Sequence, residues 1–412
     1  MKHLILTLTM LFSSLALYGQ YDVIYDSTFS GDGIAAVSYR ITSDQGVFLQ
    51  PDGKIILLAE RRITFDSAKF SVLRLTESGA LDVTYNNIGI NNFPTLFSDD
   101  PNPTGLLLPN NELVVGGAGE YTPWYSNSLI LHKYKENGKM DLLFGNGGAV
   151  SISEDSLSLY CNDLKIYNDT SFLVLYGGSF FGSDTFIQKV FICKLNTDGR
   201  IDSSFAINGK LELPSGLFTS AKKIVLSNDG SMYILGNYNL NFEYYDLVIK
   251  LNPDFTIDPG FQFDSNGSNY TITDIEVDED AKLIIVGYYY AYKFKLWRYM
   301  PNGSLDNSFS KDGMIEEDLN RNIGGIRHLY IQPDGKLLLS FSGGAIAMRV
   351  NPNGSMDYSF DLDGISEVRP IYDINFEYQG ASGLVRQPDG KLIFMTENES
   401  DFIRVLRVKT RP

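Results

Sequence analysis

Short runs of apolar residues, separated by turns rich in Gly, Asn and Asp, recur along the whole chain. Within many of these runs apolar and polar residues alternate with a period of two, and stretches with the 3.6-residue period of a helix are scarce. Turn residues at such short intervals leave room only for strands of a few residues. The pattern therefore predicts an all-β protein built from many short strands.

The clearest repeated element is a pair of apolar strands around a Gln-Pro-Asp-Gly-Lys turn, at residues 50–54, 332–336 and 387–391. Pro presets the first dihedral angle of the turn, and Asp-Gly accepts the left-handed position that follows, so the element is predicted to be a β-hairpin. Weaker copies of the turn lie at Asn110-Asn111, Asp169-Thr170, Asp229-Gly230 and Asp280-Ala281. The chain thus contains seven hairpins.

A second element follows each hairpin: a basic residue, an Asp eight positions later, and an aromatic residue three positions after the Asp. Its six complete copies contain the pairs Arg74 and Asp82, Lys133 and Asp141, Lys194 and Asp202, Lys250 and Asp258, Arg298 and Asp306, and Arg349 and Asp357. We expect each pair to form an ion pair across a turn, because a half-buried charge is stabilised by a partner. We expect the aromatic residue to fill the space between repeats. A motif that is present in every repeat is predicted to be structural.

The two ends of the chain carry complementary halves of one repeat. Arg407 has no Asp after it, whereas Asp26 near the N-terminus has Phe29 and Gly33 at the expected positions but no basic residue before it. A closed ring needs such a match, because an open array leaves strand edges exposed. Repeats of about 56 residues are close in size to four-stranded propeller blades. We predict a seven-bladed β-propeller over residues 21–412, closed by N- and C-terminal strands that share one blade, with Arg407 paired to Asp26.

This repeat, with its hairpin turn followed by Arg-x-Asn-x-x-Gly-x-Leu-Asp-x-Ser-Phe, resembles the delta-60 repeat family of secreted bacterial proteins. The resemblance covers essentially all of residues 21–412 and is clearest over 47–90 and 290–395. It implies a repeated β fold and export to the bacterial cell envelope or beyond. It implies no catalytic residues.

The first twenty residues are predicted to be a signal peptide. Lys2 and His3 precede an apolar run that ends near Tyr18, which is too short to span a bilayer comfortably. We therefore expect an exported protein, in the periplasm, at the cell surface or outside the cell, without a membrane-spanning segment. A net charge of -16 argues against nucleic acid as a partner, because nucleic acid requires a basic surface.

The search for catalytic motifs finds none that would hold a metal, a phosphate or an activated nucleophile, so no metal site and no cofactor are predicted. Cys161 and Cys193 are expected on non-adjacent strands and not bonded. The loops predicted to gather on one face are rich in aromatic residues, which are favoured in binding surfaces. The candidate ligand-binding residues are Tyr121, Trp124, Tyr125, Phe180, Tyr244, Tyr245, Tyr289 and Tyr378.

These features favour an exported, non-enzymatic binding or scaffold propeller that engages a glycan or a protein through an aromatic loop face. One alternative is a carbohydrate-active hydrolase or lyase that uses carboxylates near the axis. Another is a structural module of a cell-surface complex. A deep axial pocket with clustered Asp, Glu and Arg would favour the enzyme, and a shallow aromatic face over an open channel would favour binding.

Overall fold

The computed structural model of the 412-residue chain describes residues 24–37, 40–41, 46–64, 67–92, 103–119, 128–181, 186–266, 268–290, 293–319, 324–361, 363–368, 381–397 and 403–409. The predicted signal peptide, residues 1–20, lies outside these ranges. The candidate binding residues Tyr121, Trp124, Tyr125 and Tyr378 also lie outside them.

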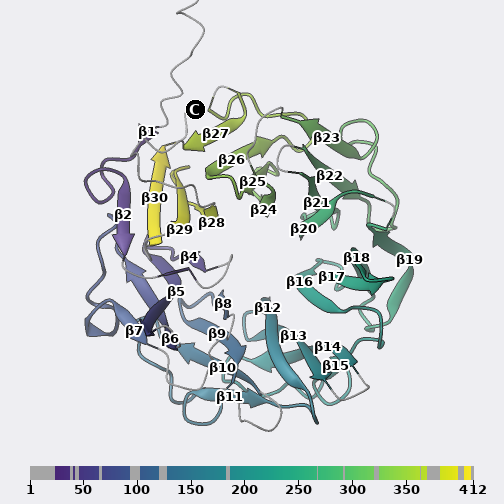
Figure 1. The fold of residues 1–412 in the computed structure, drawn as a ribbon, viewed down its shortest axis with the longest axis horizontal. Helices are drawn as coiled ribbons and strands as arrows, with labels where there is room; N and C mark the ends of the chain where they lie inside the picture. Colours follow the sequence, from purple (N-terminus) through teal and green to yellow (C-terminus); the bar gives the residue numbers. More distant parts are fainter. Residues whose placement is uncertain are drawn as a thin grey trace, which may run out of the picture.

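Seven antiparallel sheets stand around a central axis, and sheets that follow one another in the chain are neighbours in the ring (Figure 1). The innermost strands of blades 1 to 7 are β4 (Val47–Leu49, preceded by β3, Arg40–Ile41), β8 (Thr104–Leu107), β12 (Ser158–Asn168), β16 (Ser220–Leu226), β20 (Thr271–Val277), β24 (Ile326–Ile331) and β28 (Ala381–Arg386). The second strands are β5 (Ile55–Thr64), β9 (Leu113–Ala118), β13 (Ser171–Phe181), β17 (Met232–Leu240), β21 (Leu283–Tyr289), β25 (Leu337–Phe341) and β29 (Leu392–Glu397).

The third strands are β6 (Ser67–Leu75), β10 (Leu129–Tyr134), β14 (Phe186–Asn196), β18 (Glu243–Leu251), β22 (Lys293–Tyr299), β26 (Ala345–Val350) and β30 (Ile403–Lys409). The outermost strands of blades 1 to 6 are β7 (Ile90–Asn92), β11 (Ala149–Ile152), β15 (Lys210–Glu212), β19 (Ile257–Asp264), β23 (Met314–Asp318) and β27 (Ile365–Val368). The described residues include one short 3-10 helix, Tyr85–Asn87. They contain no helix with the length and apolar character needed to cross a membrane.

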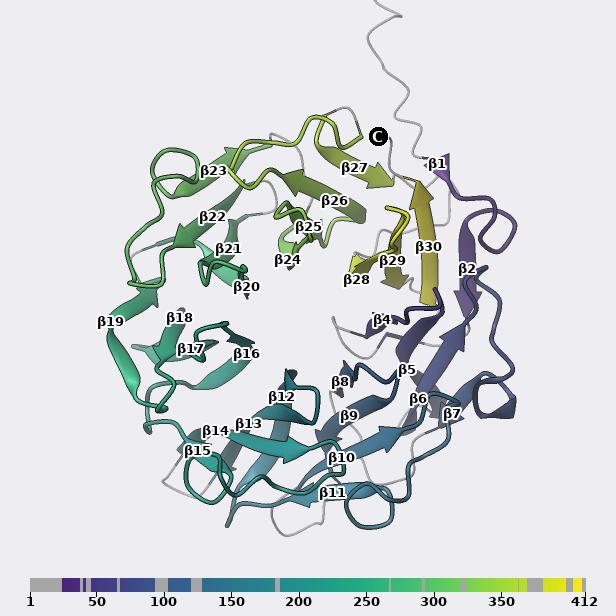
Figure 2. The ribbon, with the colours of Figure 1, turned by 180° about the vertical axis from the view of Figure 1, so that it is seen from behind.

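The ring is closed by strands from both ends of the chain. In blade 7, β30 pairs on its outer side with β1 (Ile24–Tyr25) and with β2 (Ile34–Val37), and Figure 2 shows β2 lying beside β30. The register places Tyr25 opposite Val408 and Ile34 opposite Leu406. The prediction of a seven-bladed β-propeller whose termini share one blade is therefore confirmed.

Each of the seven basic residues of the repeat contacts its acidic partner. Arg298 Nε lies 2.8 Å from Asp306 Oδ2, and Arg407 Nε lies 2.8 Å from Asp26 Oδ2 across the seam of the ring. The remaining pairs are Arg74 with Asp82 (2.8 Å), Lys133 with Asp141 (2.9 Å), Lys194 with Asp202 (2.9 Å), Lys250 with Asp258 (3.4 Å) and Arg349 with Asp357 (2.6 Å).

Five of these basic residues also donate to a backbone carbonyl oxygen of the next blade: Arg74, Lys133, Lys250, Arg298 and Arg407. Arg298 Nη1 donates to the carbonyl oxygen of Pro352 in the next blade at 2.6 Å, and its guanidinium stacks over Phe309 at 4.6 Å. At the seam, Arg407 Nη1 donates to the Glu77 carbonyl oxygen at 2.6 Å. The basic–acidic pair recurs in every repeat because it acts as a clasp, which is a set of contacts that fixes one blade against the next.

Five innermost strands carry a β-bulge at the same place in the repeat. One residue of the strand has no partner on the second strand, and these unpaired residues are Asn162, Lys222, Thr273, Arg327 and Ser382. A bulge bends the strand and redirects the side chains around it. The residues that follow the bulges are brought to the axis of the propeller.

Candidate functional site

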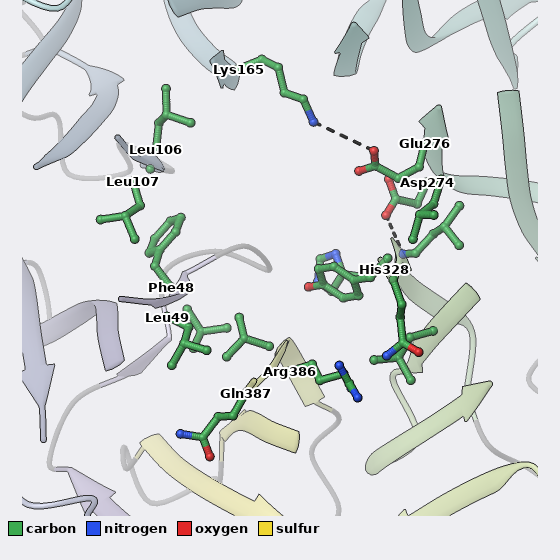
Figure 3. Close-up of a pocket in the computed structure, with 18 of the residues that line it drawn as sticks. Phe48, Leu49, Leu106, Leu107, Lys165, Asp274, Glu276, His328, Arg386 and Gln387 are labelled. Atoms are coloured by element: carbon green, nitrogen blue, oxygen red, sulfur yellow. Dashed lines mark hydrogen bonds and ion pairs between the residues drawn. The ribbon is translucent and has the colours of Figure 1, made fainter. Parts of the chain in front are cut away.

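A pocket of about 820 Å³ lies on the axis, and the innermost segments of all seven blades line it (Figure 3). The strands expose alternate side chains to it, as expected for the two-residue period of a β-strand. Two layers result from the register. The first layer holds the residues that follow the bulges, Asp163, Lys223, Asp274 and His328; the second holds Phe48, Leu106, Lys165, Glu276, Tyr330 and Val385.

The two sides of this axial pocket differ in chemistry. Blades 7, 1 and 2 supply an apolar wall, with Arg386 and Gln387 of blade 7 at its end, whereas blades 3 to 6 supply most of the charged and hydrogen-bonding groups. Figure 3 shows the two walls facing each other. The apolar wall consists of Val385, Phe48, Leu49, Leu106 and Leu107. A ligand in the pocket would therefore contact apolar groups on one side and charges on the other.

Lys223 is the centre of the charged wall. Its Nζ lies 2.6 Å from Asp274 Oδ1 and 2.7 Å from Glu276 Oε1, and Lys165 Nζ lies 4.0 Å from Glu276 Oε2. Burial alone would lower the pKa of Lys223, but the two carboxylates raise that pKa well above its usual value. Burial would raise the pKa of Glu276, and the charges of Lys223 and Lys165 lower it below its usual value. Both groups are therefore held in their charged forms.

Two buried aspartates connect the inner strands of neighbouring blades. Asp163 Oδ2 accepts the backbone N–H of Ile224 at 2.9 Å, and Asp274 Oδ2 accepts the backbone N–H of Leu329 at 2.8 Å. Their Oδ1 atoms accept the N–H of the next residue in their own strands. Burial raises the pKa of Asp163 to about 6, although Lys165 acts in the opposite direction. Each carboxylate of the charged wall is thus engaged by a lysine or by backbone donors.

The remaining polar residues of the pocket come from blades 6 and 7. His328 Nε2 lies 3.3 Å from the Ser382 carbonyl oxygen, and burial raises the pKa of Tyr330 well above its usual value. Arg386 lies at the end of the pocket next to the hairpin turn of blade 7. Tyr330 and Arg386 can donate hydrogen bonds to a ligand, whereas Nε2 of His328 already faces a carbonyl oxygen. The saturated carboxylates offer a ligand little besides fixed charge.

The four described members of the predicted aromatic face lie on three blades. Tyr244 is 66% exposed at the tip of the β17–β18 hairpin, and Tyr245 beside it is half-buried with its ring 5.7 Å from that of Tyr238. Tyr289 is half-buried at the tip of the β21–β22 hairpin, and its ring lies 4.2 Å from that of Tyr290. These two tips belong to neighbouring blades 4 and 5.

Phe180, in β13, is the described candidate that is tied most closely to the core, because it packs on the apolar cluster shared by blades 2 and 3. Cys161 and Cys193 are both buried and not bonded to each other. Their strands, β12 and β14, are separated by β13.

Sequence reasoning missed the axial pocket. The signal was present as a column of the repeat in which the type of residue changes from blade to blade: Phe48, Leu106, Lys165, Glu276, Tyr330 and Val385. The neighbouring column, Asp163, Lys223, Asp274 and His328, carries the same signal, because each member stands six residues before the Asp of its hairpin turn.

The fold and the repeat define the protein as a member of the β-propeller class. A family model described as "Domain of unknown function (DUF5122) beta-propeller" matches residues 50–85, 280–309 and 332–360. The matched segments lie in blades 1, 5 and 6 and support a β-propeller repeat family. The finer resemblance to delta-60 repeats stays a prediction.

Among solved structures, the chain is similar to a streptogramin B lyase, with a TM-score of 0.50 and 13% identity over 91% of this chain and 98% of that chain. It is also similar to the polysaccharide lyase Uly1, with a TM-score of 0.53 and 9% identity over 89% of this chain and 90% of that chain. At these identities the likeness shows the fold alone. No curated protein sequence matches the chain.

Proposed function

We propose that this protein is an exported, non-enzymatic binding propeller that takes a short oligosaccharide into its axial pocket. The two-sided lining of the pocket is the observation that carries the proposal. A sugar ring has an apolar C–H face and a polar edge of hydroxyl groups, and these match the wall around Phe48 and the wall around Lys165 and Tyr330. The pocket volume of about 820 Å³ falls within the range that small-molecule sites occupy.

The state of the carboxylates favours binding over hydrolysis. A glycosidase needs one carboxyl group that donates a proton and a second one that acts as base or nucleophile. Lys223 bridges Asp274 and Glu276, and Asp163 is occupied by two backbone N–H groups. A clustered set of charges is therefore present at the axis, as the enzyme hypothesis requires, but its carboxylates are committed to the fold.

A second candidate surface is formed by the tips of blades 4 and 5. Phe242 is 97% exposed, Tyr244 is 66% exposed and Tyr290 is 60% exposed. Exposed aromatic side chains of this kind suit a glycan or a protein partner. A structural module of a cell-surface complex would use such a surface without filling the axial pocket.

A glycan array probed with three proteins separates these functions: the wild type, Leu106→Trp and Tyr244→Ala. Leu106 lines the apolar wall, so an indole there occupies the pocket while the wall stays apolar. Tyr244 serves as the matched surface change. We expect selective glycan binding that Leu106→Trp loses and Tyr244→Ala keeps, with the fold of both variants verified by circular dichroism.

The opposite pattern, loss in Tyr244→Ala alone, would move the binding site to the blade tips. Release of sugar products by the wild type that stops in Glu276→Gln would overturn the non-enzymatic assignment. An array without any selective binding by the folded wild type would remove the glycan and leave a protein partner, which pull-down of exported proteins would test.

A further inference from the structure

Arg386, in the innermost strand of blade 7, is the charged member of a repeat column that is otherwise apolar. The strand register defines the column, because Arg386 pairs with Leu392 in blade 7 as Leu49 pairs with Ile55 in blade 1. In blades 2 to 6 the same position holds Leu107, Ile166, Leu226, Val277 and Ile331. Six blades thus place a branched apolar residue where blade 7 places an arginine. The fold therefore does not require a charge at this position.

The guanidinium of Arg386 is available to a ligand. The residue is exposed, and no described residue forms an ion pair or a hydrogen bond with it. The carboxylate of Asp389, in the adjoining hairpin turn, is paired with Lys391 at 2.7 Å. Arg386 lines the axial pocket, and Figure 3 shows it apart from the carboxylates Asp274 and Glu276 of the charged wall. An unpaired cation thus stands at the blade 7 end of the pocket.

The carboxylates of the pocket, in contrast, are already engaged. Lys223 bridges Asp274 and Glu276, and Asp163 accepts two backbone N–H groups. The described lining residues from blades 6, 7 and 1 include no carboxylate. A guanidinium has five N–H donors and no acceptor. A ligand at this end of the pocket is therefore expected to supply the acceptors, and an anion supplies the strongest ones.

Apolar side chains stand on both sides of this cation. In the neighbouring blades 6 and 1 the same position of the repeat holds Ile331 and Leu49, and both residues line the pocket together with Arg386. A sugar ring that carries an acid group can contact such aliphatic side chains through its C–H face while the acid group meets the guanidinium. A neutral sugar offers only hydroxyl groups to the same donors, and those hydrogen bonds are weaker.

We infer that the sugar taken up by the axial pocket is acidic, and that Arg386 binds its acid group, a uronate carboxylate or a sulfate ester. Both groups present several oxygens that the planar guanidinium can meet at once. The inference rests on the proposed function and narrows its ligand from short oligosaccharides in general to anionic ones. Arg386 is then the residue that sets the specificity of the pocket.

The test is a glycan array in which each uronate-containing or sulfated oligosaccharide stands beside its carboxyl-reduced or desulfated form. We expect the wild type to bind the acidic member of a pair at least about tenfold more tightly, the factor that one hydrogen bond to a charged group supplies. Arg386→Leu introduces the residue that blades 1 and 2 have at this position. It is expected to keep the melting temperature of the wild type, to lose the preference and to bind the neutral member as before.

Two further variants serve as controls. Arg386→Lys keeps the charge but not the planar fork, so its preference for acidic glycans is expected to lie between those of the wild type and Arg386→Leu. Arg200→Gln removes a positive charge from the turn between β14 and β15, where the side chain is 83% exposed. This variant is expected to bind like the wild type.

Equal binding of acidic and neutral members by the wild type would overturn the inference and leave the proposed glycan-binding function standing. A preference that Arg386→Leu retains would also overturn it, since another residue would then hold the acid group. If the wild type binds no glycan at all, the proposed function is lost together with the inference. Preference for the uronate pairs or for the sulfated pairs identifies the acid group that Arg386 binds.

Discussion

At the scale of single residues, the basic–acidic pair of the repeat serves two purposes. Arg298 neutralises the buried Asp306 of its own blade, and its second nitrogen reaches the Pro352 carbonyl oxygen of the next blade. Asp306 Oδ1 in turn accepts the hydroxyl of Ser308 at 2.7 Å. Each polar group in this network has a partner, so removal of one member leaves several groups without a hydrogen bond or counter-charge.

Arg298→Ala is expected to destabilise the protein by about 3 kcal/mol, because breaking a buried pair leaves a charge without compensation. This loss is at the low end of the range for broken buried ion pairs, because Lys282 Nζ also lies 3.3 Å from Asp306 Oδ2 and still compensates its charge. Arg298→Lys keeps the charge, as Lys133 does naturally in blade 2, and is expected to lose less than half as much. Urea unfolding measures both, and equal losses in the two variants would contradict the clasp.

Stability is expected to fall in acid through the aspartates of the clasps. Burial alone would raise the pKa of Asp306, but hydrogen bonds from Ser308 and the charge of Arg298 lower it to about 2. A folded-state pKa below the unfolded value of about 3.9 stabilises the protein above pH 4, and this contribution is lost as pH falls from about 4 to about 2. The contribution amounts to about 2–3 kcal/mol at neutral pH.

Asp306→Asn is expected to remove this part of the pH dependence. Its unfolding free energy, measured from pH 7 down to pH 3, should approach that of the wild type as the pH decreases. A constant difference between the two proteins over this range would rule out Asp306 as the titrating group.

At the scale of elements, the turns were the most predictable part of the fold, and the bulges were the least. Each Pro-Asp-Gly turn marks a hairpin between a first and a second strand, because Pro and Gly restrict the backbone by themselves. The bulge at Lys222 carries no such mark. It depends on how β16 packs against its neighbours, so the pocket residues could not be assigned to the axis from the sequence.

The positions of the candidate aromatic residues were also only partly predictable from the sequence. The sequence located Tyr244 and Tyr289 in loops, which the structure places at hairpin tips. The sequence could not show that Phe180 packs on the core, because burial depends on the neighbouring blade.

The turns between third and fourth strands pack against the aromatic residue of the preceding blade. Gly138 (φ +80°) lies so close to Tyr85 that a Cβ would approach ring atoms to 2.8 Å, whereas Gly216 (φ +79°) has no atom within 4 Å of such a Cβ. Both substitutions to Ala carry a left-handed backbone cost of about 1–2 kcal/mol. Gly138→Ala should carry about 1–3 kcal/mol more from overpacking.

Denaturant unfolding of Gly138→Ala and Gly216→Ala measures that difference directly, since their φ angles are nearly the same. Equal destabilisation of the two variants would show that the turn does not pack tightly between blades.

At the scale of the whole molecule, the seam in blade 7 is where the ring is held by strands far apart in sequence. Asp26 is fully buried there and contacts Arg407, Lys391 and Lys409. The sequence predicted this closure correctly because the two ends carry halves of one motif, which constrains topology more than any single strand does.

Asp26→Ala is expected to loosen the seam selectively. Amide hydrogen exchange in β30 should accelerate by at least about tenfold, because local opening follows the local free energy. Asp202→Ala, which removes the equivalent aspartate inside blade 3, should leave β30 unchanged. Acceleration spread evenly over all blades in Asp26→Ala would contradict a seam that opens first.

The central claim, that the axial pocket holds a short glycan without cleaving it, is tested most directly by a crystal structure with the tightest glycan from the array. We predict an intact sugar chain on the axis, between the apolar wall at Phe48 and the charged wall at Glu276. A glycan bound only at the tips of blades 4 and 5, or a cleaved product in the axial pocket, would contradict the account.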